Sequence, residues 1–130
     1  MLKLNLLCMG ILLFLSSLYG CKPKGDFDSL SVDEFASRIQ NEEVQRLDVR
    51  TPGEYSEGHI MKFININVMD DSFVDMADTL LDKDRPVALY CRSGNRSKKA
   101  AMILSEKGYK VLELDKGFNA WQAAGKDIEH

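Results

Sequence analysis

The amino-acid sequence predicts an α/β domain with a mainly parallel sheet flanked by helices on both faces. Short apolar strands alternate with helical segments from residue 30 onward, an order typical of this class. Residues 86–90 (PVALY) form a continuous apolar run, as expected of a strand that is buried on both faces of a parallel sheet. The 130 residues suffice for one such domain and not for two.

Residues 1–20 are expected to be an export signal outside this domain. They carry one charge, Lys3, and the nearly apolar run 4–18 is shorter than the roughly 20 residues of a membrane span. The run ends at Gly20-Cys21, which resembles a bacterial lipobox, so we expect a lipid on Cys21. The alternatives are an uncut anchor or a plainly secreted protein.

A lipidated Cys21 predicts a chain organised in three parts and held at a membrane. These are a signal peptide (1–20), a polar tether (21–29) and one domain (30–130). The protein would then be exported and anchored on the periplasmic or cell-surface side of a bacterial membrane.

The first half of the domain contains three predicted helices and two strands. Ser31 and Glu34 form a capping-box pattern that predicts a helix over 32–40. A strand over 44–50 follows, and Pro52 opens a short helical turn that ends near Gly58. Isoleucines at alternate positions predict a strand over 63–68, and helical spacing of apolar residues predicts a helix over 72–81.

The second half repeats the strand–helix order twice. The strand 86–90 precedes a helix over 97–107, which Gly108 ends. A strand over 111–114 and a helix over 118–124, closed by Gly125, complete the domain.

The loop between strand 86–90 and the next helix contains Cys91, the one thiol left once Cys8 and Cys21 are assigned to the signal and the lipid. Gly94 gives the loop the freedom to curl its backbone N–H groups inward, and Arg92 and Arg96 add positive charge. Together with the helix N-terminus, these features favour a thiolate and an anionic ligand. The alternative is a buried structural cysteine beside two solvated arginines.

Three segments resemble the rhodanese homology domain, in that family's order and spacing. Residues 91–97 (CRSGNRS) are similar to its active-site loop. Residues 48–55 (DVRTPGEY) with 58–60 (GHI) are similar to its N-terminal signature, and 117–121 (GFNAW) with 124–125 to its closing helix. One segment departs from the family pattern: Met61-Lys62-Phe63 stands where the family commonly has a Pro-Gly-Ala type turn. The resemblance therefore does not predict the conformation of this turn or of the pocket rim.

The resemblance implies a rhodanese-like fold and a thiosulfate sulfurtransferase. Cys91 would take the outer sulfur of a small anionic donor such as thiosulfate, become a persulfide and pass the sulfur to a thiol, cyanide or a protein. No metal and no organic cofactor is implied. The expected substrate-binding residues are Arg92, Ser93, Gly94, Asn95, Arg96 and Ser97.

Five further residues of the three segments are expected to support the site. Asp48 would cap nearby backbone or pair with an arginine, Arg50 and Glu54 would form an ion pair, and Trp121 would lie in the core. His59 is expected to be structural, although a catalytic Cys–His pair would have to use it.

Two other functions remain open from the sequence. A non-catalytic binding module is one, although such rhodanese-like modules typically lack the cysteine. A Cys-dependent phosphatase is the other, but the four residues between Cys91 and Arg96 make a shorter loop than the five of the tyrosine phosphatases. The net charge of −3 argues against nucleic acid as a partner, and no Cys-x-x-Cys motif supports a thioredoxin-like oxidoreductase.

Overall fold

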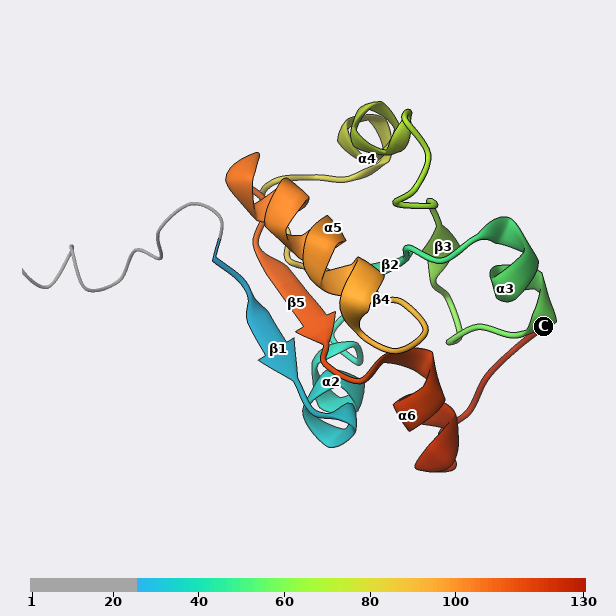
Figure 1. The fold of residues 1–130 in the computed structure, drawn as a ribbon. Coiled ribbons are helices and arrows are strands. Elements are labelled where there is room, and N and C mark those ends of the chain that lie inside the picture. Colours follow the sequence, from blue (N-terminus) through green and yellow to red (C-terminus); the bar gives the residue numbers. More distant parts are fainter. Residues whose placement is uncertain (1–25) are drawn as a thin grey trace, which may run out of the picture.

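A computed structural model describes residues 26–130, which fold around a single five-stranded parallel sheet. The strands are ordered β1-β5-β4-β2-β3, so β4 and β5 lie inside the sheet and β1 and β3 at its edges (Figure 1). Their bounds are β1 (Asp28–Leu30), β2 (Gln45–Asp48), β3 (Ile64–Asn65), β4 (Val87–Tyr90) and β5 (Val111–Leu114). The predicted α/β fold class is therefore confirmed.

Five helices connect the strands, and each lies within two residues of its prediction at either end. They are α2 (Val32–Arg38), α3 (Pro52–Glu57), α4 (Phe73–Leu80), α5 (Asn95–Glu106) and α6 (Gly117–Ala123). The predicted N-terminus of α2 is confirmed, because the Ser31 side chain accepts a hydrogen bond from the Glu34 N–H. Among residues 26–130, none of the helices has the length and apolar composition of a membrane span.

The two faces of the sheet carry separate apolar clusters, because side chains alternate along each strand. Leu47, Leu89 and Val111 face α4 and α5. On the opposite face, Tyr90 of β4 and Leu112 of β5 pack against α2 and α6. Helices thus cover both faces, as predicted, and all four residues of β4 are fully buried.

The first strand begins at Asp28, inside the segment 21–29 that the sequence predicted to be a tether. Asp28–Leu30 forms β1, which pairs in parallel with Leu112–Leu114 of β5. The short polar segment gains strand structure from backbone pairing with a strand far along the chain, which local sequence does not report. The predicted signal peptide and Cys21 lie outside the described residues.

Candidate active site

Cys91 lies directly after β4, at the carboxyl end of the sheet, where ligands bind in open α/β domains. The residue is 1% exposed, and its Sγ accepts a hydrogen bond from the Gly94 N–H at 3.1 Å. Helix α5 begins at Asn95, two residues earlier than predicted, so its positive N-terminal end follows the loop at once. The cysteine loop, residues 91–97, therefore brings a backbone donor and a helix N-terminus to one sulfur.

Two glycines allow the loop to lie against the neighbouring backbone. Gly94 has φ of 109°, and a Cβ there would lie 2.1 Å from the Asp115 carbonyl oxygen. Gly117 has φ of 66°, and a Cβ there would lie 2.6 Å from the carbonyl oxygens of Cys91 and Arg92. Those two carbonyls accept hydrogen bonds from the Phe118 and Asn119 N–H groups at 2.8 and 3.0 Å, so the start of α6 fixes the start of the loop.

Arg96, predicted from the sequence to bind substrate, forms an ion pair with Glu54. The guanidinium donates to both Glu54 carboxylate oxygens at 2.7 and 2.9 Å. Hydrogen bonding from Arg96 is the main reason why the pKa of Glu54 is lowered to about 2, although partial burial opposes the shift. Glu54 also closes a capping box with Thr51 at the start of α3. The Arg96–Glu54 pair thereby connects α3 to the cysteine loop.

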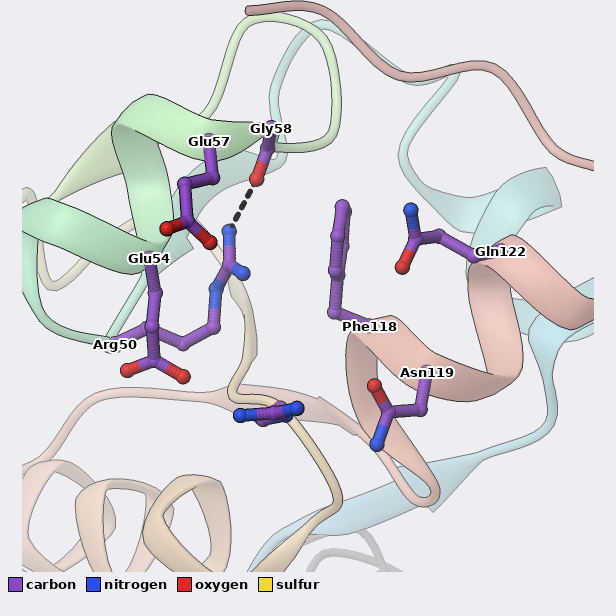
Figure 2. A pocket seen from close by; sticks show the side chains of 8 residues that line it. Arg50, Glu54, Glu57, Gly58, Phe118, Asn119 and Gln122 are labelled. Atoms are coloured by element: carbon purple, nitrogen blue, oxygen red, sulfur yellow. Dashed lines mark hydrogen bonds between the residues drawn. The ribbon is translucent and has the colours of Figure 1, made fainter.

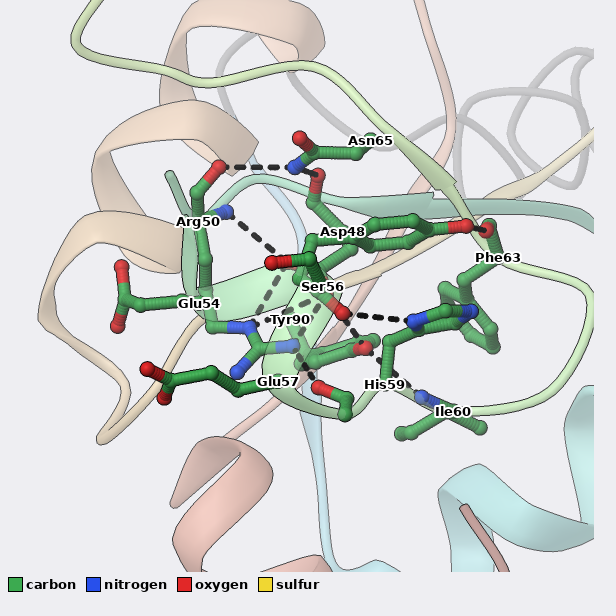
Figure 3. A network of polar contacts seen from close by, with 12 residues as sticks. Asp48, Arg50, Glu54, Ser56, Glu57, His59, Ile60, Phe63, Asn65 and Tyr90 are labelled. Atoms are coloured by element: carbon green, nitrogen blue, oxygen red, sulfur yellow. Dashed lines mark hydrogen bonds and ion pairs between the residues drawn. The ribbon is translucent and has the colours of Figure 1, made fainter. Parts of the chain in front are cut away.

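The predicted ion pair between Arg50 and Glu54 is wrong, because Arg50 pairs with Asp48 (Figure 3). Arg50 donates to the Asp48 carboxylate at 2.7 Å and to the Gly58 carbonyl oxygen at 2.7 Å. Burial alone would lower the pKa of Arg50, but the hydrogen bonds and charge of Asp48 outweigh it and raise that pKa above its ordinary value. Asp48 also accepts from the Arg50 N–H, so both roles predicted for Asp48 occur together.

Tyr90 completes this buried network beneath the site and was not singled out from the sequence. Its hydroxyl donates to Asp48 at 2.7 Å and accepts from the Ile60 N–H at 3.0 Å. Burial, followed by the charge of Asp48, raises the pKa of Tyr90. The ring of Tyr90 stacks with Phe118, so the network joins β2 and β4 to α6.

His59 and Trp121 make contacts of a structural kind. His59 is 6% exposed, stacks on the Tyr55 ring, and its Nδ1 lies 2.8 Å from the Tyr55 carbonyl oxygen. Its Nε2 faces Glu129 at 3.2 Å. Trp121 packs edge-on against Phe35 in the core beside α2. None of these contacts involves Cys91.

The Met61-Lys62 turn adopts the conformation for which glycine is suited. Lys62 has φ of 68°, in the left-handed region that favours glycine. In the sequence resemblance, Lys62 stands where the glycine of the Pro-Gly-Ala type turn is expected. The Lys62 N–H donates to Glu129 at 3.0 Å, so the C-terminal residues hold a turn that this sequence builds without glycine.

A cavity of about 210 Å³ opens above the loop, between α3 and α6 (Figure 2). Glu54 and Glu57 lie on one side of it, and Asn119 and Gln122 on the other. The remaining lining residues are Arg50, Gly58, Arg92 and Phe118. Arg92 is exposed, as are Ser93 and Asn95, so these three predicted substrate-binding residues lie at the surface of the loop.

Sequence reasoning missed one polar group beside the sulfur, the carboxylate of Glu113 on β5. Ser97 is fully buried, and its hydroxyl accepts from the Cys91 thiol at 3.3 Å and donates to Glu113 at 2.5 Å. Glu113 is itself fully buried. A glutamate inside a strand that is otherwise apolar was the available signal, because such a carboxylate needs partners.

Chemically, the arrangement offers a nucleophile, a backbone donor and cationic side chains. Within residues 26–130, no group of three or more His, Cys, Asp or Glu residues could hold a metal ion. A thiol in such surroundings is suited to forming a covalent adduct with an anionic group.

Comparison with known proteins places this geometry in a family. The family model for the rhodanese-like domain matches residues 31–124. A rhodanese-related protein from Thermoplasma volcanium is 28% identical with a TM-score of 0.67, over 79% of this chain and 98% of that one. A Rhodopseudomonas palustris protein of unknown function, described as a possible tyrosine phosphatase, is 26% identical with a TM-score of 0.65, over 79% and 85%.

A larger protein also contains a similar domain. Reduced CoADR-RHD of Bacillus anthracis is 30% identical with a TM-score of 0.69, over 80% of this chain. The match covers 18% of the Bacillus anthracis protein, so this chain corresponds to a small part of it. The family match spans most of the chain and contains the cysteine loop, and the chain belongs to the rhodanese-like domain family.

Proposed function

We propose that the protein is a sulfurtransferase that carries sulfane sulfur as a persulfide on Cys91. The observation that carries the proposal is the position of Sγ, 3.1 Å from the Gly94 N–H and followed at once by the N-terminus of α5. Backbone donors and a helix N-terminus stabilise negative charge on a bound group without needing a cofactor.

The reaction would proceed in two balanced steps. The Cys91 thiolate attacks the outer sulfur of a donor such as thiosulfate, the S–S bond of the donor breaks, and sulfite leaves with the bonding electrons. A thiophilic acceptor, such as a thiol, cyanide or a protein, then attacks the outer sulfur of the persulfide. Cys91 leaves as thiolate, so the enzyme returns to its starting state and ping-pong kinetics are expected.

The two arginines of the loop would serve different purposes. Arg96 donates two hydrogen bonds to the Glu54 carboxylate, so it contributes mainly to the positioning of α3 and the loop. Arg92 is exposed and lines the cavity, where a guanidinium can meet an incoming anion. Thiosulfate and departing sulfite are both anions of a size that such a cavity admits.

Intact mass after incubation with thiosulfate tests the proposal. The purified protein should gain one sulfur atom, which peptide mass mapping should locate at Cys91 and which cyanide should remove. Cys91→Ala is the matched control and should gain none. A folded protein whose Cys91 is shown to be reduced, yet takes up no sulfur, would exclude transfer from thiosulfate and favour a binding module.

A phosphatase is the second candidate, because one structural relative is described as a possible tyrosine phosphatase. The four-residue spacing between Cys91 and Arg96 and the engagement of Arg96 by Glu54 leave this loop less able to surround a phosphate. Hydrolysis of p-nitrophenyl phosphate by the parent protein, lost in Cys91→Ala, would favour this candidate. We expect no such hydrolysis.

We also propose that the domain is anchored to a membrane through a lipid on Cys21. The apolar run 4–18 followed by Gly20-Cys21 supports the proposal. Bacteria producing the protein should incorporate radiolabelled palmitate into it, and Cys21→Ser should abolish the label. Labelling that persists in Cys21→Ser would contradict lipidation at this residue.

A further inference from the structure

Glu113 is a buried carboxylate placed one hydroxyl group away from the reacting sulfur. Its Oε2 accepts from the Ser97 hydroxyl at 2.5 Å, and its Oε1 accepts from the Ser29 hydroxyl of β1 at 2.7 Å. Lys98, one residue after Ser97 on α5, lies 3.2 Å from Oε1. The carboxylate thus has two hydroxyl donors and a cation, which is the set of partners that a fully buried anion requires.

The cation is held in place by a second carboxylate. Lys98 pairs with Asp115 at 2.9 Å and donates to the Asp115 carbonyl oxygen at 3.0 Å. Burial alone would lower the pKa of Lys98, but Asp115 and Glu113 outweigh it and raise that pKa. Lys98 therefore stays cationic and forms an ion pair with the Glu113 carboxylate.

The ion pair of the Glu113 carboxylate with Lys98 fixes the direction of the hydrogen bond that Ser97 makes. A hydroxyl has one proton to donate, and a carboxylate without a proton can only accept. Ser97 therefore gives its proton to Glu113 and presents a lone pair to Cys91, 3.3 Å away. A lone pair stabilises the thiol, which can donate to it, and disfavours the thiolate, which cannot.

We infer that Glu113 is a positioning residue that orients the Ser97 hydroxyl, so that Ser97 presents a lone pair to Cys91 Sγ and makes the sulfur less reactive. The Gly94 N–H favours the thiolate, so the two contacts act on the sulfur in opposite directions. The consequence is a thiol that reacts less readily with oxidants and alkylating agents than the loop alone would predict.

Other charges near Cys91 act through space and not through Ser97. They come from the loop, from α5 and from the segment that follows β5: Arg92, Arg96, Lys98 and Asp115. Asp115 is the useful comparison, because it is a carboxylate that shares Lys98 with Glu113 and is 40% exposed. In the described part of the chain, the Asp115 side chain makes no hydrogen bond to Ser97.

The rate of alkylation of Cys91 by iodoacetamide, measured between pH 5 and 10 with peptide mass mapping, tests this role. Glu113→Gln keeps the shape of the side chain and removes the charge. It should lower the midpoint of the pH profile by about one unit and raise the rate at pH 7 about tenfold. Ser97→Ala removes the acceptor of the thiol proton and should also lower the midpoint. Asp115→Asn should leave the midpoint within about 0.3 units.

Several results would overturn the inference. A midpoint that rises in Ser97→Ala would mean that the hydroxyl donates to the thiolate after all. An equal shift in Asp115→Asn and Glu113→Gln would reduce the role of Glu113 to its charge. A shift from Glu113→Gln that persists undiminished in the Ser97→Ala background would remove Ser97 from the pathway.

The inference rests on the proposed function only in taking Cys91 as the reacting group. Alkylation needs no sulfur donor, so sulfur uptake and alkylation fail independently. Circular dichroism of each variant checks that the domain is folded. If Glu113→Gln does not fold, the direction of the midpoint shift in Ser97→Ala still tests the inference.

Discussion

At Gly94 the cysteine loop has no room for a side chain, and the backbone there adopts a conformation that side chains rarely take. The Asp115 carbonyl oxygen lies 2.1 Å from where a Cβ would be, and φ is 109°. A side chain at this position would force the loop and the Asp115 carbonyl apart. The position of the Gly94 N–H against Sγ therefore depends on this glycine.

Gly94→Ala should lower the free energy of unfolding by roughly 2–4 kcal/mol and slow any reaction of Cys91, because strain and collision act together. Gly108→Ala is the matched control. Gly108 has φ of 100° and nothing within 4 Å of its Cβ position, so it carries the strain without the collision. It should cost about 1 kcal/mol. Urea unfolding of both variants measures the difference, and equal losses would remove the collision from the explanation.

Glu54 gives the fold a specific sensitivity to acid. Its pKa in the folded protein is about 2, against an ordinary value of 4.5, chiefly because Arg96 hydrogen-bonds to it. A carboxyl with a lowered pKa stabilises the folded state above its ordinary pKa, and this contribution is lost as the pH falls toward the folded-state value. The relevant window is therefore about pH 5 to pH 2.

Glu54→Gln should be less stable than the parent by roughly 1–2 kcal/mol at pH 6, and the difference should shrink as the pH falls through that window. Urea unfolding at pH 6 and pH 3 measures it. Glu57→Gln, an exposed position at the end of the same helix, should change stability little at either pH. A difference that stays constant with pH would mean that the carboxylate of Glu54 contributes through packing alone.

At the scale of the elements, the turn between α3 and β3 carries strain that its sequence does not relieve. Lys62 has φ of 68°, and Glu129 compensates by accepting the Lys62 N–H. His59 and Glu129 also exchange backbone hydrogen bonds at 2.8 Å in both directions. The C-terminal residues thus hold together the end of α3 and the turn that follows it.

Lys62→Gly should raise the free energy of unfolding by about 0.5–1 kcal/mol, because the relief of a left-handed conformation exceeds the entropy that glycine adds to the unfolded chain. Lys99→Gly, at an exposed position inside α5, should lower it by about 1 kcal/mol. Chemical denaturation of both variants checks the opposite signs. A loss of stability in Lys62→Gly would mean that the lysine side chain stabilises the turn.

The elements that the sequence predicted are those whose signals are local. The strand at Val111–Leu114 and the capping of α2 by Ser31 follow from apolar runs and caps, and both occur as predicted. β1 escaped prediction because Asp28–Leu30 has three residues and depends on β5 for its pairing. The same reason explains why the predicted Arg50–Glu54 ion pair is wrong. Arg50 pairs with Asp48 because Arg96 of α5 occupies Glu54, and the position of α5 cannot be predicted from a local pattern.

The cysteine loop shows the same division between local motif and distant partner. Its motif located Cys91 and its backbone donors at the carboxyl end of β4. Glu113 lies on β5, sixteen residues beyond Ser97 of α5, and the pairing of β5 with β4 brings Glu113 to the start of α5. The motif therefore identifies Cys91, whereas the partner of Ser97, Glu113, can be identified only from the tertiary structure.

At the scale of the whole molecule, the proposed donor must reach a site on a protein that carries its own negative charge. The formal net charge is −3, which repels an anion at long range. Near the cavity most cations are already paired, Arg50 with Asp48 and Arg96 with Glu54. Among the described residues that line the cavity, Arg92 is the cation that forms no ion pair with a carboxylate.

Arg92 should therefore supply most of the attraction for an anionic donor. Arg92→Gln is expected to lower kcat/KM for thiosulfate about tenfold at low salt, mainly through KM, because it removes a charge that acts on approach and binding. Glu57→Gln, on the opposite wall of the cavity, should raise kcat/KM a few-fold by removing a repelling charge. Both effects should weaken between about 10 and 500 mM NaCl, since salt screens exposed charges. If Arg92→Gln lowers kcat by the same factor at every salt concentration, the guanidinium acts on the bound sulfur and not on the approach of the donor, and the attraction must come from the backbone donors of the loop.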